Sequence, residues 1–379
     1  MKRILIVALS ATLLAAGCQK TKIINQINPT GEPSLTFTTG MGKLTKVSDV
    51  SSDADSVGMA NLKAQDFRVW AYGVEDFDRT KEDDREGWDD MLNLPVTFLN
   101  GVWGTTKQHF WPGEGLELKF FAVSADEAFM GEKFGPDAAS PIVPDAAGST
   151  MEITGFVAEN ADYDTDLMVA DLVQRAQRLG ANSVDLTFRH ALAKVQFAFN
   201  TIETEGINVF VQEVRVEGLK TKGDLAVSYD SKNNNHTVFN WTLDDASAKD
   251  VTDDWEDLAT TEDGFPTEIE GFSPEEDDYK AMKITSIKDK DPQPNVFTTW
   301  LVLPQEVEEK IVYITYLMNE RKFEAKFSLA YDALRQTNQP ASWKDNQYVR
   351  YLVTLAPNLI SFTPQVGEWD DVLEVSPEN

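Results

Sequence analysis

Short segments in which apolar and polar residues alternate recur along this chain, separated by stretches rich in turn-forming residues. Residues 116–123 (LELKFFAV) and 193–199 (AKVQFAF) are two examples. Because successive side chains of a β-strand point to opposite faces of a sheet, a period of two predicts half-buried strands. Many such strands, with no long helical pattern between them, predict an all-β protein built of β-sandwiches rather than an α/β fold.

Aromatic and β-branched residues indicate where these strands lie. Strands are predicted at residues 35–38, 67–72, 94–99, 116–123, 184–188, 193–199, 209–216, 297–303, 311–316, 323–329 and 348–355. The segment 171–179 (DLVQRAQRL) has helical spacing but room for no more than about two or three turns, so we expect a connector at residues 171–183. The acidic residues 75–90 are expected to form a solvated loop. The acidic stretch 244–291, which lacks a clear pattern, is expected to form a long, partly mobile insertion.

The N-terminus has the arrangement of an export signal. Lys2 and Arg3 precede an apolar run that ends in small residues directly before Cys18, the one cysteine of the chain. This run is too short to cross ~30 Å of hydrocarbon as a helix. We therefore expect residues 1–17 to be a cleaved lipoprotein signal peptide and Cys18 to carry lipid. An ordinary secretory peptide with an incidental cysteine is the alternative.

Composition limits the classes of partner. The formal net charge of −29 disfavours nucleic acid and a bare anionic membrane surface, so the lipid would do the anchoring. A single cysteine provides no disulfide framework. Residues 18–34 are polar and contain proline and glycine, which predicts a flexible tether. The remaining length, with 42% hydrophobic residues overall, is enough for two cores.

The sequence offers little for catalysis. His109, His190 and His236 are not spaced as metal ligands, and neither a GxSxG elbow nor a phosphate-binding GxxxxGK[ST] loop occurs. We expect no metal site, no cofactor and no enzymatic activity, and we interpret His190 as a structural histidine. Carboxylates are so abundant that a glycosidase-like acid pair is the least favoured function.

The nine tryptophans have two interpretations. They could stack on sugars, which would make the chain a glycan-binding surface lipoprotein; among them are Trp103, Trp111, Trp300, Trp343 and Trp369. In a strand-rich protein, however, tryptophans usually fill the sandwich core. We favour core filling.

Several segments, in their order along the chain, resemble one family. They are FRVWAYG (67–73), FWP (110–112), LKFFAVS (118–124), DLMVA (166–170), FRHALAKV (188–195) and VGEW (366–369). They are similar to segments of the fimbrillin-like lipoproteins of Bacteroidales-type bacteria. The resemblance implies two transthyretin-like β-sandwich domains, which we place at residues 35–180 and 181–379. It also implies a structural subunit of an adhesive pilus (fimbrium) at the outer membrane, which contributes to cell adhesion.

The family also implies a mode of assembly. A protease removes the N-terminal segment with its first strand, and the emptied groove accepts a strand from a neighbouring subunit by β-augmentation. Here the removable strand would be residues 35–38. The donor would come from the C-terminal strands, where one apolar face holds Val349, Tyr351, Val353 and Leu355 and another holds Ile360 and Phe362. Alternatively, both strands permanently complete their own sheets.

The processing site differs from one pattern in the family. Relatives with arginine-specific maturation carry an arginine soon after the first strand, whereas this chain has none between Cys18 and Phe67. Lys43 and Lys46 are the candidate cleavage positions instead. If the chain is never cut, it would remain a lipid-anchored accessory or anchor subunit. Partners would be other pilus subunits, the outer membrane through the lipid, and a host or bacterial surface ligand.

One modification site is also suggested. Asp55-Ser56-Val57 fits the short pattern used for O-glycosylation in such bacteria, which makes Ser56 the candidate residue.

Overall fold

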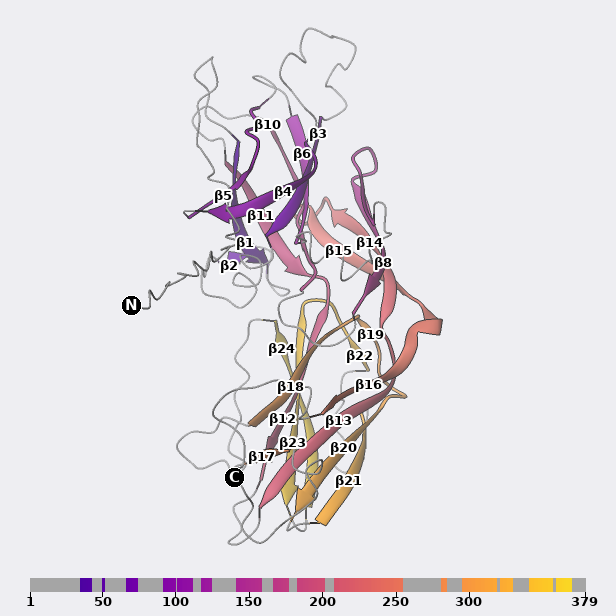
Figure 1. The fold of residues 1–379 in the computed structure, drawn as a ribbon. Helices are drawn as coiled ribbons and strands as arrows, with labels where there is room; N and C mark the ends of the chain where they lie inside the picture. Colours follow the sequence, from indigo (N-terminus) through magenta and orange to yellow (C-terminus); the bar gives the residue numbers. More distant parts are fainter. Residues whose placement is uncertain are drawn as a thin grey trace, which may run out of the picture.

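The described part of the chain is built of strands. The computed structural model describes residues 35–42, 50–51, 66–73, 91–99, 101–111, 117–124, 141–158, 166–176, 183–201, 208–254, 281–284, 295–318, 321–329, 341–356 and 359–369. Within these ranges the one helical element is a single 3₁₀ turn, η2 (Asp245–Ser247). The predicted all-β, sandwich-like fold is confirmed. Figure 1 shows an upper lobe that contains β1 and a lower lobe that contains β24.

The upper lobe is built around a nine-stranded sheet that closes on itself. The strand order is β10-β6-β3-β4-β5-β1-β11-β9, and β9 returns to β6 where Val169 lies opposite Val123. Its strands are β1 (Thr36–Gly42), β2 (Val50–Ser51), β3 (Phe67–Gly73), β4 (Met91–Leu99), β5 (Val102–Thr105), β6 (Glu117–Val123), β9 (Met168–Ala170), β10 (Val173–Ala176) and β11 (Ser183–His190). Phe37, Phe67, Phe120 and Phe188 belong to the core that this sheet encloses.

A second sheet packs against the outside of the first. It has the order β15-β14-β8-β7 and consists of β7 (Ile142–Asp145), β8 (Thr150–Val157), β14 (Lys222–Asp230) and β15 (His236–Leu243). Its Ile153 and Val227 share one apolar cluster with Trp70 of β3 and Phe121 of β6. The two residues from β3 and β6 lie next to inward-facing neighbours, so both faces of these strands are buried.

The lower lobe is a two-sheet sandwich. One sheet has the order β18-β12-β23-β24 and contains β12 (Ala193–Asn200), β18 (Asn295–Val302), β23 (Gln347–Ala356) and β24 (Leu359–Glu368). The facing sheet has the order β16-β13-β20-β21, with β17 also paired to β13, and contains β13 (Val209–Lys220), β16 (Ala248–Asp254), β17 (Met282–Ile284), β20 (Ile311–Met318) and β21 (Arg321–Ser328). A small ribbon joins β19 (Gln305–Glu306) to β22 (Ser342–Trp343).

A long ribbon connects the two lobes. β13 of the sandwich continues through Thr221 into β14 of the upper lobe, while β15 and β16 return along them (Figure 1). β14 pairs with β8, and β11 pairs with β1. Strand pairing therefore links residues on both sides of the domain boundary expected between residues 180 and 181.

The structure confirms all eleven predicted strands and corrects one expectation. The connector expected at residues 171–183 contains β10, which pairs with β6, so sheet formation overrides the helical spacing of that segment. Of the insertion expected at residues 244–291, residues 244–254 and 281–284 are described and contain η2, β16 and β17, and the rest lies outside the described residues. β16 and β17 both pair with β13, which explains their ordered placement in an acidic stretch. The predicted loop 75–90 lies outside the described residues. In the described ranges, no helix has the length and apolar character needed to span a membrane.

Candidate functional site

The first strand, β1, is held between strands that come from distant parts of the chain. It runs parallel to β11, with Phe37 opposite Val184, and antiparallel to β5, where Phe37 lies opposite Trp103. The backbone N–H of Leu35 donates to the carbonyl of His109 at 2.7 Å. β1 is thus an interior strand of the closed sheet, although it lies near the start of the described chain.

The side chains of β1 divide between the core and the surface. Leu35, Phe37 and Met41 are buried, whereas Thr38 is exposed and donates to the carboxylate of Asp185. The ring of Phe37 meets Phe67 and Phe120 edge-on, with centroids 5.9 and 6.3 Å away. These edge-to-face contacts add to the burial of the Phe37 ring. Without β1, the core of the upper lobe would open to water.

A hydrogen bond also fixes β1 from inside the lobe. The indole Nε1–H of Trp103, a residue only 3% exposed, donates to Oγ1 of Thr39 at 2.9 Å. A strand in this position must therefore fill apolar pockets at alternate residues and accept one buried hydrogen bond. Sequence reasoning missed Trp103 and Asp185 as partners of β1, because alternation identifies strands but not their neighbours.

The predicted donor residues lie together on one face of the lower sandwich. Val349, Tyr351, Val353 and Leu355 of β23 are fully buried. In β24, Phe362 pairs with Val353 and Ile360 with Leu355, and Phe362 belongs to the same core as the four residues of β23. Phe362 is buried, whereas Ile360 is 37% exposed.

β23 and β24 differ in their position within the sheet. β23 is flanked by β12 and β24, so its backbone is paired on both sides. Among the described strands β24 has one neighbour, β23, and lies at the edge of its sheet. Pro364 has no backbone N–H to donate to a second neighbouring strand, which is compatible with this edge position. Detaching β24 would leave the rest of the sheet paired, whereas detaching β23 would divide it.

The other predicted site residues, Cys18, Lys43, Lys46 and Ser56, lie outside the described residues. Their roles stay predictions.

Two histidines in the described ranges, His190 and His236, have hydrogen-bonded structural surroundings. His190 is 1% exposed, and its Nδ1 lies 2.5 Å from Oδ2 of the buried Asp166. His236 Nδ1 accepts from Arg189 at 2.9 Å. The described residues contain no cluster of three or more side chains suited to a metal. The interpretation of His190 as a structural histidine is confirmed.

A buried ion pair holds the second sheet to the closed sheet. Arg189 of β11 donates to both oxygens of Asp171, at 2.8 and 3.1 Å. The backbone N–H and the hydroxyl of Thr237, on β15, both donate to Asp171 at 2.8 Å. Burial, and then the charge of Asp171, raise the pKa of Tyr229 far above its usual value. The cluster acts as a structural joint within the upper lobe.

The exposed fractions of the tryptophan side chains distinguish core filling from sugar binding. Trp103, Trp111, Trp300, Trp343 and Trp369 are each less than 5% exposed. Side chains buried to this degree cannot stack on an external sugar, so core filling is confirmed for these five. The glycan-binding alternative therefore loses these five tryptophans, whereas Trp241 is half-buried and Trp88 and Trp255 lie outside the described residues.

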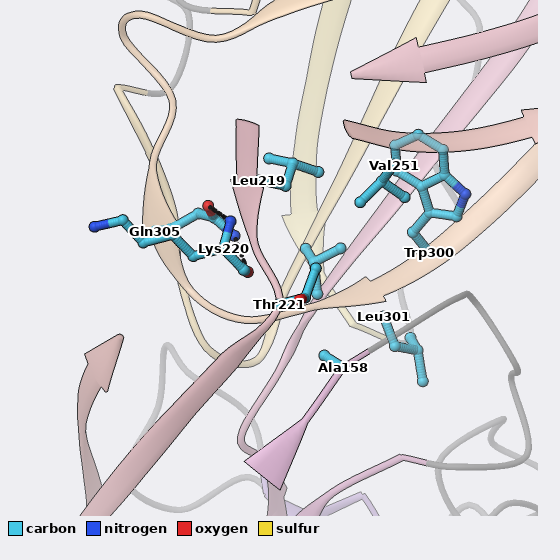
Figure 2. Close-up of a pocket in the computed structure, with 9 residues that line it drawn as sticks. Ala158, Leu219, Lys220, Thr221, Val251, Trp300, Leu301 and Gln305 are labelled. Carbon is cyan, nitrogen blue, oxygen red and sulfur yellow. Dashed lines mark hydrogen bonds between the residues drawn. The ribbon is translucent and has the colours of Figure 1, made fainter. Parts of the chain in front are cut away.

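A small pocket lies beside Thr221, where β13 passes into β14, and Figure 2 shows the residues that line it. Gln305 lines it: its Oε1 accepts from the backbone N–H of Lys220 at 3.0 Å, and its Nε2 donates to the Lys220 carbonyl at 3.2 Å. Trp300, Leu219 and Val251 supply apolar walls. The free space suits about one water molecule rather than a ligand, so the pocket belongs to the junction of β13 and β14.

The chain has structural relatives of similar size. It shares 16% identity with a fimbrial protein from Bacteroides vulgatus, with a TM-score of 0.53 over 88% of this chain and 99% of that one. A candidate cell adhesion protein from Bacteroides ovatus shares 12% identity, with a TM-score of 0.46 over 90% of this chain and 99% of that one. At these identities the first likeness establishes similarity of fold.

A search of curated proteins found no significant match. A family model gives a more specific assignment than the structural likeness does. The model described as fimbrillin-like matches residues 57–369, which is most of the chain and includes every described strand of both lobes except β1 and β2. The protein therefore belongs to the fimbrillin-like family.

Proposed function

We propose that this protein is a structural subunit of an adhesive pilus that is exported as a lipoprotein and polymerises by β-strand exchange after proteolysis. Membership of the fimbrillin-like family supports the pilus role. The observation that carries the mechanism is the placement of β1. This strand follows an N-terminal extension, fills a core between β5 and β11, and directly precedes the segment that contains Lys43 and Lys46.

Each part of the N-terminal extension has a role in this proposal. Residues 1–17 direct export, Cys18 receives lipid, and residues 18–34 hold the fold away from the outer membrane. Cleavage at Lys43 or Lys46 then separates the lipid and β1 from the rest of the chain. The subunit enters the fimbrium with a groove flanked by β5 and β11, in which backbone hydrogen bonds and alternate apolar pockets await a strand.

The C-terminal lobe supplies the donor. The edge position of β24 supports Ile360 and Phe362 as donor residues more directly than Val349, Tyr351, Val353 and Leu355 of the doubly paired β23. An uncleaved chain would instead remain at the outer membrane as an anchor or accessory subunit. In either position the surface of the subunit would contact a host or bacterial surface ligand, and we expect neither a cofactor nor catalysis.

Limited proteolysis of the mature full-length protein tests this function. Trypsin-like cleavage after Lys43 or Lys46 should convert the monomer into ladders that survive mild detergent. The variant K43Q/K46Q, which keeps the rest of the chain, should stay monomeric under the same treatment. Cleaved protein that remains strictly monomeric at high concentration would contradict a shaft subunit. N-terminal sequencing of protein from the cell surface separates the two positions, because an anchor begins at Cys18.

A further inference from the structure

The outer face of one sheet of the lower sandwich is buried, although the other described sheet of the sandwich packs on the opposite face. In β12 and β23, alternate residues such as Phe197 and Tyr351 belong to the core between the two sheets, so the residues between them point to the outer face. Six of these outer-face residues are less than 10% exposed, namely Lys194, Gln196, Ala198, Tyr348, Arg350 and Leu352. A further layer must therefore cover this face.

The register of the two strands arranges the six residues in three rows. β12 and β23 run parallel, with Lys194 opposite Tyr348, Gln196 opposite Arg350, and Ala198 opposite Leu352. Successive rows are two residues apart, which is about 6–7 Å along the strands. The third row is apolar, and its two residues form a hydrophobic cluster that contains no other described residue.

The first two rows carry positive charge. Nε of Arg350 donates to Oε1 of Gln196 at 2.7 Å, and Nη2 of Arg350 donates to the hydroxyl of Tyr348 at 2.9 Å. Nζ of Lys194 lies 4.3 Å from the centroid of the Tyr348 ring. The outer-face positions of β12 and β23 include no acidic residue. Because buried charges in proteins are paired, the layer over these two cations is expected to bring carboxylates.

The chain leaves the described residues at the first of these rows. Trp369, the last described residue, is buried, and its carbonyl accepts from Nζ of Lys194 at 3.2 Å. The residues that follow, 370–379, read DDVLEVSPEN. Their carboxylates come first and their apolar residues next, which is the order in which the rows change from charged to apolar.

We propose that residues 370–379 fold back over this face and run in the direction of β12 and β23. An extended chain advances one row for every two residues. Starting from Trp369 at the first row, Asp371 reaches the row of Arg350 and pairs with its guanidinium group. Leu373 reaches the third row and completes the apolar cluster there. The proposal concerns one subunit by itself and does not depend on strand exchange.

The same geometry assigns the other side of the segment. Alternate residues of an extended chain point to opposite sides, so Asp370 and Val372 point away from the sheet. The proposal therefore distinguishes adjacent residues of the same chemistry. Asp371 and Leu373 hold the segment in place, whereas Asp370 and Val372 do not.

A covered face matters in a chain with a formal net charge of −29. If the face were open, Lys194 and Arg350 would attract the acidic surface of a neighbouring copy. A segment of the same chain is present at a high effective concentration and excludes that contact. Residues 370–379 thus act as an intramolecular shield against self-association through this face.

Thiol labelling of the third row tests the proposal. In the full chain carrying Cys18→Ser, Leu352→Cys places the one thiol beneath the proposed segment, and its reaction rate with a maleimide reports how often the face is uncovered. D371N/L373S should raise this rate at least about tenfold, because the ion pair and the apolar contact are both lost. D370N/V372S makes the same substitutions at the positions that point away, and should leave the rate within about twofold of the parent.

Three results would overturn the proposal. If neither pair of substitutions changes the rate, or both change it equally, residues 370–379 do not lie on this face in the stated register. If the rate for the unsubstituted segment rises on dilution of the protein, a second copy supplies the cover. If Val353→Cys, which faces the core, also becomes reactive in D371N/L373S, the segment stabilises the whole sheet instead of covering one face.

The shielding role has its own test. At low ionic strength D371N/L373S should elute from a sizing column as larger species, and high salt should return it to the monomer position. D370N/V372S should elute as a monomer in both conditions. If D371N/L373S also stays monomeric at low salt, the segment does not act as a shield.

Discussion

The imidazole of His190 stacks on the indole of Trp369, with ring centroids 4.1 Å apart and planes 10° from parallel. Trp369 follows the last residue of β24, and His190 ends β11 of the upper lobe. Nδ1 of His190 hydrogen-bonds with the carboxylate of Asp166, and Nζ of Lys194 donates to the carbonyl of Trp369 at 3.2 Å. The end of the proposed donor strand is therefore clamped to the lobe that contains the groove.

Trp369→Ala should release this clamp. Removing a buried indole should cost about 3–5 kcal/mol of unfolding free energy. The backbone amides of β24 should then exchange with deuterium faster than those of β12, because only the end of β24 depends on the stack. In Trp369→Phe, which keeps an aromatic ring against His190, the amides of β24 should exchange at a rate between those of Trp369→Ala and the wild type. Unchanged exchange in β24 with faster exchange elsewhere would show that Trp369 does not hold this strand.

Asp171→Asn should weaken the joint between the two sheets of the upper lobe. The substitution replaces a buried carboxylate that accepts from Arg189 and Thr237, and breaking such a pair costs about 3–5 kcal/mol. The double variant Asp171→Leu/Arg189→Met should recover much of the loss, since it removes both charges. Urea unfolding of the single and double variants measures the coupling. Equal losses in all variants would show that packing, not the ion pair, sets the stability of the joint.

Alternation in the sequence was sufficient to predict most strands but not their partners. The pattern LTFT identified β1. Asp185, which accepts from Thr38 of this strand, is 147 residues away in the sequence, and no local pattern shows which strands flank β1. β14 was not among the predicted strands, although it could have been. Its Leu225 and Val227 alternate with exposed or half-buried residues, which is the same pattern.

Where the prediction was wrong, tertiary pairing overrode local preference. The segment from Asp171 has helical spacing, but Val173 lies opposite Phe120 in an antiparallel ladder with β6. Within the acidic stretch 244–291, where no strand was predicted, Val251 is buried in the sandwich core and its strand pairs with β13. Burial of one apolar residue and a ladder of backbone bonds outweigh the solvation of its acidic neighbours.

Thr39→Val should destabilise the seating of β1. Valine keeps the shape of the side chain but gives Trp103 no oxygen acceptor, and a buried donor without that partner costs about 1–3 kcal/mol. After cleavage at an engineered site, the variant β1 should dissociate faster than the wild-type strand, which a label on the released segment would report. Thr39→Ser, which keeps the hydroxyl, should dissociate at close to the wild-type rate. Identical dissociation rates for the Val and Ser variants would show that the hydrogen bond from Trp103 does not hold β1 in place.

Asp345→Asn should stabilise the protein at neutral pH. Burial is the main cause that raises the pKa of the Asp345 carboxyl, so the folded state holds this proton more tightly than the unfolded chain does. Stability therefore falls as pH rises from the usual range of an aspartate through the raised folded pKa, and asparagine, which cannot ionise, avoids this loss. At pH 7 the variant should unfold at a higher urea concentration than the wild type, and below the ordinary aspartate pKa the two proteins should unfold at the same concentration.

Asp245→Asn is the matched control of opposite sign, because the hydrogen bond between Asp245 and Lys220 lowers the pKa of the Asp245 carboxyl. That variant should lose some stability at pH 7, the loss disappearing at low pH. If both variants shift the urea midpoint in the same direction, the local charge environments do not control the pH dependence.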